Sequence, residues 1–226
     1  MDHAALDNPG VSWVHQLHRR LVRSCPGYWR LEGLWRRAIG RPEQDVHWTR
    51  VVMDRQTRRL VDQLDLTGAR VLEISGDKWK DLPGVAGYES AFFPDYDVCQ
   101  GVLPGSFDLI IAEQVFEHLL WPYRAARHVH QMLRPGGHFL ITTPFLYKVH
   151  HYPTDCSRWT ETGLKHFLAE AGFALDDIAT GSWGNRRCAI ANLKAGGSVK
   201  YKGRLHSLKN EPLFPVVVWA LARKGQ

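Results

Sequence analysis

Two stretches of this chain of 226 residues concentrate side chains that could move protons. His118 stands in the first, and His150, His151 and Asp155 stand in the second, which spans 144–160. Histidine suits general base catalysis because its ordinary pKa lies close to neutral pH. We therefore expect His118, His150 or His151 to take a proton from a hydroxyl or an amine, and Asp155 to orient one of the histidines.

Each assignment has an alternative that needs no catalysis. His118 could be a structural histidine that bonds a nearby loop, and Asp155 could pair with Arg158 to clamp the loop. A metal site built from His150, His151 and Asp155 is not expected, because adjacent histidines in an extended loop point apart. The four cysteines are widely spaced and form no C-x-x-C pair, so the sequence predicts no metal ion.

The elements that position these residues alternate between strand and helix. Short apolar runs at 70–74, 107–112 and 138–143 are typical of strands buried on both faces. A helix is predicted at 122–133, where Pro122 suits the first turn, and another after Thr160, a good N-cap. This alternation indicates a mostly parallel sheet with right-handed crossovers.

Both ends of the chain differ from this pattern. Residues 1–66 are predicted to be helical, and residues 1–60 hold eleven arginines and six acidic residues, which is +5 of the net charge of +6. Runs at 174–180 and 214–222 predict two strands that could pair antiparallel. The basic segment between them, 181–213, shows no clear helix and is expected to form a flap near the site or a poorly ordered loop. Basic patches favour anionic partners.

The order of these elements resembles class I S-adenosylmethionine-dependent methyltransferases, in particular the small-molecule type 11 group. The resemblance rests on four pieces in the family's order and spacing: 71–77 (VLEISGD), 107–110 (FDLI), 117–119 (EHL) and 133–137 (LRPGG). It implies a doubly wound, mostly parallel, seven-stranded Rossmann-like sheet with an antiparallel last strand. Residues 67–226 would form this domain, and residues 1–66 a helical cap over the acceptor site.

The resemblance also assigns the residues that would bind S-adenosylmethionine. They are expected at the carboxyl ends of the strands, where open α/β sheets bind ligands: Glu73, Ser75, Gly76, Asp95, Asp97, Glu113 and Gln114. The family's loop after the first strand has two or three glycines, whereas this loop has only Gly76. The family's ribose-binding acid would fall near Phe92, so Asp95 is expected to replace it, and Asp97 to contact the adenine.

The predicted function is methyl transfer to an oxygen or nitrogen of a small polar acceptor, such as a sugar or a natural product. The basic stretches favour an anionic acceptor. The altered glycine loop leaves open a binding or scaffold subunit without activity. The basic ends leave open an RNA methyltransferase, although nucleic acid is not the expected partner because no RNA-binding module is recognisable. Neither a signal peptide nor a membrane span is predicted, so the cytoplasm is expected, and a homodimer is left open.

Overall fold

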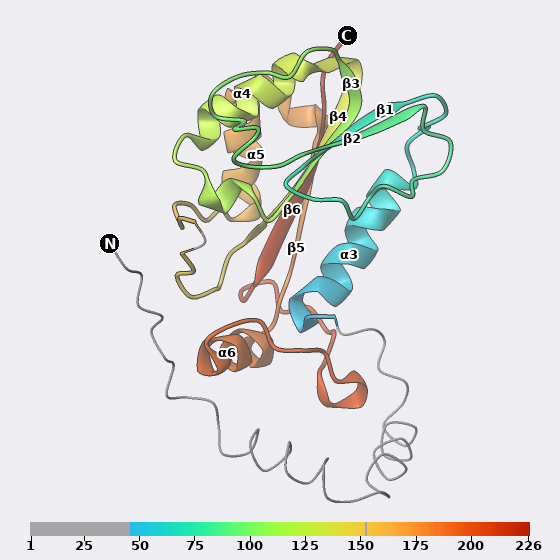
Figure 1. Cartoon of the computed structure of the whole chain (residues 1–226). Helices are drawn as coiled ribbons and strands as arrows, with labels where there is room; N and C mark the ends of the chain where they lie inside the picture. Colours follow the sequence, from blue (N-terminus) through green and yellow to red (C-terminus); the bar gives the residue numbers. More distant parts are fainter. Residues whose placement is uncertain (1–45, 152) are drawn as a thin grey trace, which may run out of the picture. The chain divides into compact units, whose positions relative to one another are not determined.

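The computed structural model describes residues 46–151 and 153–226, and its centre is a six-stranded sheet (Figure 1). The strands are β1 (Arg70–Ile74), β2 (Gly87–Ala91), β3 (Phe107–Glu113), β4 (Leu133–Pro144), β5 (Ile178–Trp183) and β6 (Val217–Arg223). Their order is β2-β1-β3-β4-β6-β5. The first four in this order are mutually parallel, and β6 runs antiparallel to both β4 and β5.

The α/β class and the antiparallel last strand are therefore confirmed, but the described part of the chain forms six strands where the sequence predicted seven. The missing strand would follow β2. Residues 92–106 instead run as turns and irregular chain, with Pro94, Gly101, Pro104 and Gly105 spread along them. Proline cannot donate to a sheet ladder and glycine weakens a strand, so this segment cannot sustain a buried strand.

Helices cover both faces of the sheet, as a doubly wound fold requires. They are α3 (Trp48–Val61), α4 (Pro122–Met132), α5 (Glu161–Glu170) and α6 (Arg186–Ala195), with short 3-10 helices η1 (Phe116–His118), η2 (Leu175–Asp177) and η3 (Gly203–Leu205). In Figure 1, α4 and α5 lie on one side of the sheet and α3 on the other. Alternate strand residues follow this division: Leu72 and Ile110 pack in the cluster of α4 and α5, whereas Val71 and Leu109 pack with Val61 of α3.

The segment between the two antiparallel strands corrects a prediction, because it contains α6. Asn185 caps the start of this helix by accepting a hydrogen bond from the Cys188 N–H, and Gly196 ends it in the left-handed conformation with φ 63°. An asparagine N-cap and a glycine at the C-terminal end are both readable signals. The sequence analysis did not use them.

Two compact units divide the chain, and almost all of the described residues belong to the larger one, Val46–Tyr201 with His206–Gln226. In the smaller unit the description covers Lys202–Leu205, where the Leu205 N–H donates to the Lys202 carbonyl. Residues 1–45, most of the expected helical cap, lie outside the described residues. None of the described helices is both long and apolar enough to span a membrane.

Candidate active site

The candidate site lies where the order of the strands reverses. The chain passes from β1 to β2 on one side and then to β3 on the other, and ligands of open α/β sheets bind beyond the carboxyl ends of such strands. Ser75 and Gln114 directly follow β1 and β3 and have φ values of 57° and 58°. Non-glycine residues rarely adopt this left-handed conformation, and they concentrate at functional sites.

Glu73 organises the loop that follows β1. Its carboxylate accepts hydrogen bonds from the backbone N–H groups of Lys78 at 3.2 Å and Trp79 at 2.9 Å, and from the Tyr88 hydroxyl at 2.5 Å. A Cβ at Gly76 would lie 2.2 Å from Glu73 Oε1, so a larger residue there would have to displace the Glu73 carboxylate from these hydrogen bonds. Trp79 is buried in the core below the loop. The single glycine of this loop is therefore sufficient for its compact turn.

Glu113 is the residue that the charged groups contact at the reversal point, the place where the order of the strands reverses. Its side chain is 6% exposed and accepts from Lys78 Nζ at 3.0 Å, Arg50 Nη1 at 3.2 Å and Trp79 Nε1 at 3.3 Å. Lys78 also pairs with Asp54 at 2.9 Å. Arg50 and Asp54 come from α3, so this helix contributes directly to the site. The sequence analysis assigned Glu113 but missed the three donors around it.

The two aspartates expected at the ribose and adenine follow β2. Asp95 is exposed. Asp97 accepts a hydrogen bond from the Cys99 N–H at 2.8 Å through Oδ1, which stabilises the turn. Both lie on the same edge of the sheet as the loop after β1, since β1 and β2 are parallel and in register up to Ile74 and Ala91.

A cavity of about 220 Å³ opens beside this point. It lies at the carboxyl ends of β3 and β4 and at the start of β6. Its lining comes from α3, from η1, from β4 and the loop after it, and from residues next to β3, α6 and β6: His47, Thr49, Arg50, Met53, Gln114, Glu117, His118, Pro144, Tyr147, His150, Ser198, Val216 and Val217. The cavity is smaller than the roughly 300–1,000 Å³ of pockets for drug-sized ligands. It therefore suits a small acceptor rather than a whole cofactor.

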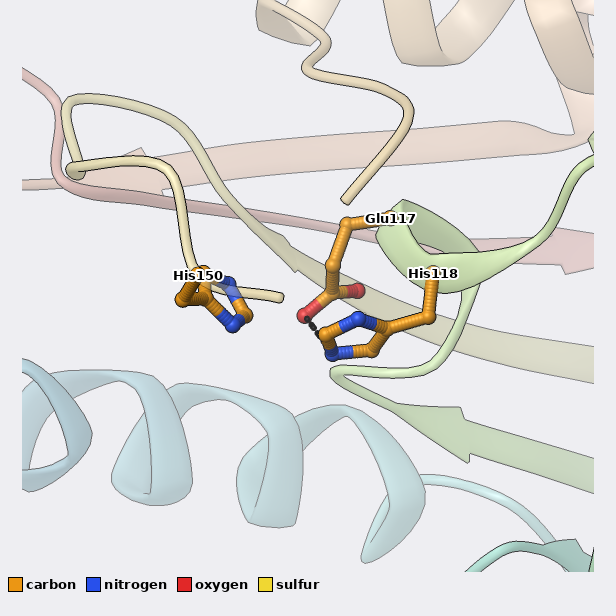
Figure 2. Close-up of side chains that lie close together, drawn as sticks. All are labelled: Glu117, His118 and His150. Carbon is orange, nitrogen blue, oxygen red and sulfur yellow. Dashed lines mark ion pairs between the residues drawn. The ribbon is translucent and has the colours of Figure 1, made fainter. Parts of the chain in front are cut away.

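Glu117, His118 and His150 converge in this cavity and are called the His–Glu cluster below. Figure 2 shows Glu117 and His118 on η1, with the His150 imidazole facing them from the loop after β4. Glu117 Oε1 lies 3.7 Å from His118 Nε2, and the centroids of the two imidazoles are 4.8 Å apart. Among the described residues, no group hydrogen-bonds either oxygen of Glu117, whose side chain is buried.

Burial sets the protonation of the His–Glu cluster. Desolvation raises the pKa of Glu117 to about 8, because the charged carboxylate loses its water. Burial and the neighbouring His118 lower the pKa of His150, which favours the neutral imidazole. The His118 Nδ1–H donates to the Thr154 carbonyl, so Nε2 is the nitrogen that carries a lone pair toward Glu117.

The loop after β4 is fixed to η1 by its own polar groups. Asp155 accepts hydrogen bonds from both terminal nitrogens of Arg158 and, at 2.7 Å, from the backbone N–H of His150. The Arg158 guanidinium holds the pKa of Asp155 down at about 2. Asp155 thus contacts the His150 backbone and not its ring. His151 is exposed and does not line the cavity, so the structure brings His118 and His150 together without it.

Several residues of the site escaped the sequence analysis, namely Arg50, Met53, Lys78, Glu117 and Tyr147. Glu117 had a usable signal, because it adjoins His118 within an otherwise apolar stretch. Arg50 and Met53 had none, since Arg50 lies 63 positions before its partner Glu113 and Met53 lies 61 positions before its partner Gln114.

A family model described as a methyltransferase domain matches residues 46–178, which is more than half of the chain. The chain belongs to this family. Its sheet order, the site at the strand reversal and the family match define it as a class I S-adenosylmethionine-dependent methyltransferase. The methyltransferase match begins at the residue before His47, so it includes α3. No curated protein sequence matches the chain significantly.

Solved structures share the fold at low sequence identity. Phosphoethanolamine N-methyltransferase 2 of Haemonchus contortus, in complex with S-adenosylmethionine, is 14% identical with a TM-score of 0.51, and the match covers 76% of this chain and 53% of that one. A complex of the Haloferax volcanii Trm112 methyltransferase activator and a putative methyltransferase matches with 15% identity and a TM-score of 0.53, and the match covers 83% of this chain and 100% of that one. A putative S-adenosylmethionine-dependent methyltransferase from Listeria monocytogenes matches with 11% identity and a TM-score of 0.51, and the match covers 76% of this chain and 96% of that one. The chain thus spans about half the length of the first of these.

Proposed function

We propose that this protein transfers a methyl group from S-adenosylmethionine to an oxygen or nitrogen of a small polar acceptor bound in the cavity at the ends of β3 and β4. The carrying observation is the His–Glu cluster in that cavity, beside the strand reversal. Oxygen and nitrogen acceptors commonly carry a proton that must leave, and the cluster offers groups that can accept one.

The residues at the reversal point fit the amino-acid end of the cofactor. That end carries an ammonium and a carboxylate, and the site holds the nearly buried carboxylate of Glu113 beside the cations of Lys78 and Arg50. We propose that Glu113 binds the ammonium and that Lys78 and Arg50 bind the carboxylate. Ser75 and Gly76 let the backbone approach closely, because neither places a bulky side chain over the turn.

The remaining cofactor contacts follow from the expectations for β2 and β3. We propose that the exposed Asp95 accepts hydrogen bonds from the ribose hydroxyls, and that Asp97 receives the adenine amino group on the carboxylate oxygen that does not bond Cys99. Gln114 closes the site from β3, since its side chain is held by the Thr142 hydroxyl at 3.0 Å.

The protein's part in the chemistry is to align and to desolvate. When bound, the cofactor supplies a methyl group on a sulfonium with a neutral leaving group, so little further activation is needed. Tyr147 and His150 line one side of the acceptor cavity, and Met53 and Val217 give it apolar walls. His118 and His150 lie where a proton of the acceptor has to be removed. The proposed acceptor is anionic, in keeping with the basic stretches of the chain.

Calorimetric titration of the full chain with S-adenosylmethionine and S-adenosylhomocysteine tests the cofactor site. We expect micromolar binding, weakened at least tenfold in Glu113→Gln because the ammonium loses its charged partner. Glu89→Gln is the matched control, since Glu89 pairs with Arg70 on the exposed side of β2 and should bind like the wild type. Absence of binding by the folded wild type would refute an enzyme that acts alone.

A binding or scaffold subunit without activity is the second candidate, and one observation favours it. The Glu73 carboxylate is engaged by the loop after β1 and by Tyr88 of β2, with Trp79 buried behind it, where family members use a glycine-rich turn. The same titration separates the two candidates. Binding of S-adenosylmethionine, followed by methyl transfer to a member of a panel of hydroxyl and amine acceptors, would exclude the scaffold.

A further inference from the structure

We infer that the His–Glu cluster is a binding site for a divalent transition-metal ion, with Glu117, His118 and His150 as its protein ligands and one coordination position open to the cavity. Two imidazoles and one carboxylate are a recurrent ligand set for zinc and for non-haem iron. Among residues 46–151 and 153–226, these three residues form a group of potential metal ligands. Their ligand atoms all lie within 4.8 Å of one another.

The distances are close to those of a bound site. A tetrahedral zinc ion with ligands at about 2.0–2.1 Å separates neighbouring ligand atoms by roughly 3.4 Å. Glu117 Oε1 and His118 Nε2 already lie 3.7 Å apart. Closing the site therefore needs only a small movement of His150, which comes from a loop rather than from the sheet. Figure 2 shows the three side chains pointing at one common space.

The outer contacts prepare the histidines for a metal. Histidine ligands typically donate their other ring N–H to a carbonyl or carboxylate, which fixes the tautomer and ring orientation. His118 does so: Nδ1 bonds the Thr154 carbonyl, leaving the Nε2 lone pair for an ion. The backbone N–H of His150 is held by Asp155, and its ring packs edge-on against Tyr147 at 5.2 Å.

Glu117 provides the independent observation. Its side chain is buried, and neither carboxylate oxygen has a hydrogen-bond partner among the described residues. A buried polar group without a partner is costly whether the carboxyl is charged or protonated. A cation between Glu117 and the two imidazoles would give the unpartnered carboxylate a favourable electrostatic interaction. A purely structural role for Glu117 leaves this cost without any offset.

The coordination position that the protein leaves open determines what the ion could do. Its use in methyl transfer rests on the proposed function. Three protein ligands leave room for a water or for a hydroxyl or amine of the acceptor. A hydroxyl bound to the ion would have a lowered pKa and release its proton to solvent at the cavity mouth. His118 and His150 would then act as ligands and not as bases, and solvent would take the proton that the bound hydroxyl releases.

The test is zinc titration of the full-length protein after removal of metals by a chelator. We expect one Zn²⁺ per chain at micromolar or lower Kd, and at least 100-fold weaker binding in Glu117→Gln and in His150→Asn. His151→Asn is the matched control, because His151 is the exposed neighbour of His150, and should bind within twofold of wild type. A wild-type affinity no better than that of Glu117→Gln, or an equal loss in His151→Asn, would overturn the proposal.

Cobalt gives a second readout that a merely structural role would not change. Co²⁺ bound by two imidazoles and a carboxylate should give visible absorption bands of low coordination number, which His150→Asn abolishes and His151→Asn retains. His150 lies on a partly exposed loop, so this variant should stay folded even if Glu117→Gln does not. Both measurements omit cofactor and acceptor, and a failure of methyl transfer therefore leaves their outcome unaffected.

Discussion

At the scale of single residues, the position of His150 depends on the clamp between Asp155 and Arg158. Arginine holds Asp155 through two parallel N–H groups, and Asp155 in turn holds the His150 backbone. Arg158→Lys keeps the charge but loses this paired geometry. We expect turnover to fall about tenfold or more while the affinity for S-adenosylhomocysteine is unchanged, measured by steady-state kinetics and calorimetry.

A matched control for this prediction lies at the other end of the same sheet. Arg134 pairs with Asp108 at the start of β3 and β4, away from the carboxyl ends that carry the site. Arg134→Lys should therefore leave turnover within about twofold of wild type, as expected for a substitution remote from the chemistry. If both variants lose turnover equally, the clamp acts through general stability and not through His150.

At the scale of elements, the two capped helices after β4 differ in what their caps hold. Thr160 accepts one hydrogen bond, from the Gly163 N–H, at an exposed position. Asn185 is buried, accepts from the Cys188 N–H and also donates to the carbonyls of Ser207 and Lys209. Asn185 therefore joins α6 to the segment that returns to β6.

This difference predicts unequal losses of stability. Thr160→Ala should lower the free energy of unfolding by about 1 kcal/mol, the usual effect of losing an N-cap. Asn185→Ala should cost about 2–4 kcal/mol, because it also removes the two partly buried hydrogen bonds to the carbonyls of Ser207 and Lys209. Urea denaturation followed by circular dichroism measures both. Equal losses in the two variants would show that the bonds to Ser207 and Lys209 contribute nothing.

The elements also show what sequence alone could predict. The apolar run of β3 identified a strand because β3 is buried on both faces, and the proline and glycine signals located α4 and α5. The resemblance predicted seven strands, and the prolines and glycines of 92–106 explain why the described part of the chain forms six. The contact of Arg50 with Glu113 was unreadable, because it depends on how α3 packs against the finished sheet.

At the scale of the whole molecule, we propose that the folded domain begins before α3. The cap was predicted to end at residue 66, yet Trp48, Met53 and Val61 of this helix are almost fully buried, in two core clusters that include β1, β3, β4, β5 and β6. Burying such side chains contributes about 1.5–3 kcal/mol each. Together they amount to much of the roughly 5–15 kcal/mol by which a domain is stable.

Two truncations therefore should behave differently. A chain that starts at Val46 retains α3 and every residue proposed to bind the cofactor, so we expect a cooperative unfolding transition and an affinity for S-adenosylhomocysteine within about threefold of the full chain. A chain that starts at Thr67 loses the three buried side chains and Arg50, and should be largely unfolded or aggregated. Thermal denaturation and calorimetry compare the two. A folded, cofactor-binding chain from Thr67 would support the predicted boundary at residue 66 and contradict the proposal that α3 belongs to the folded domain.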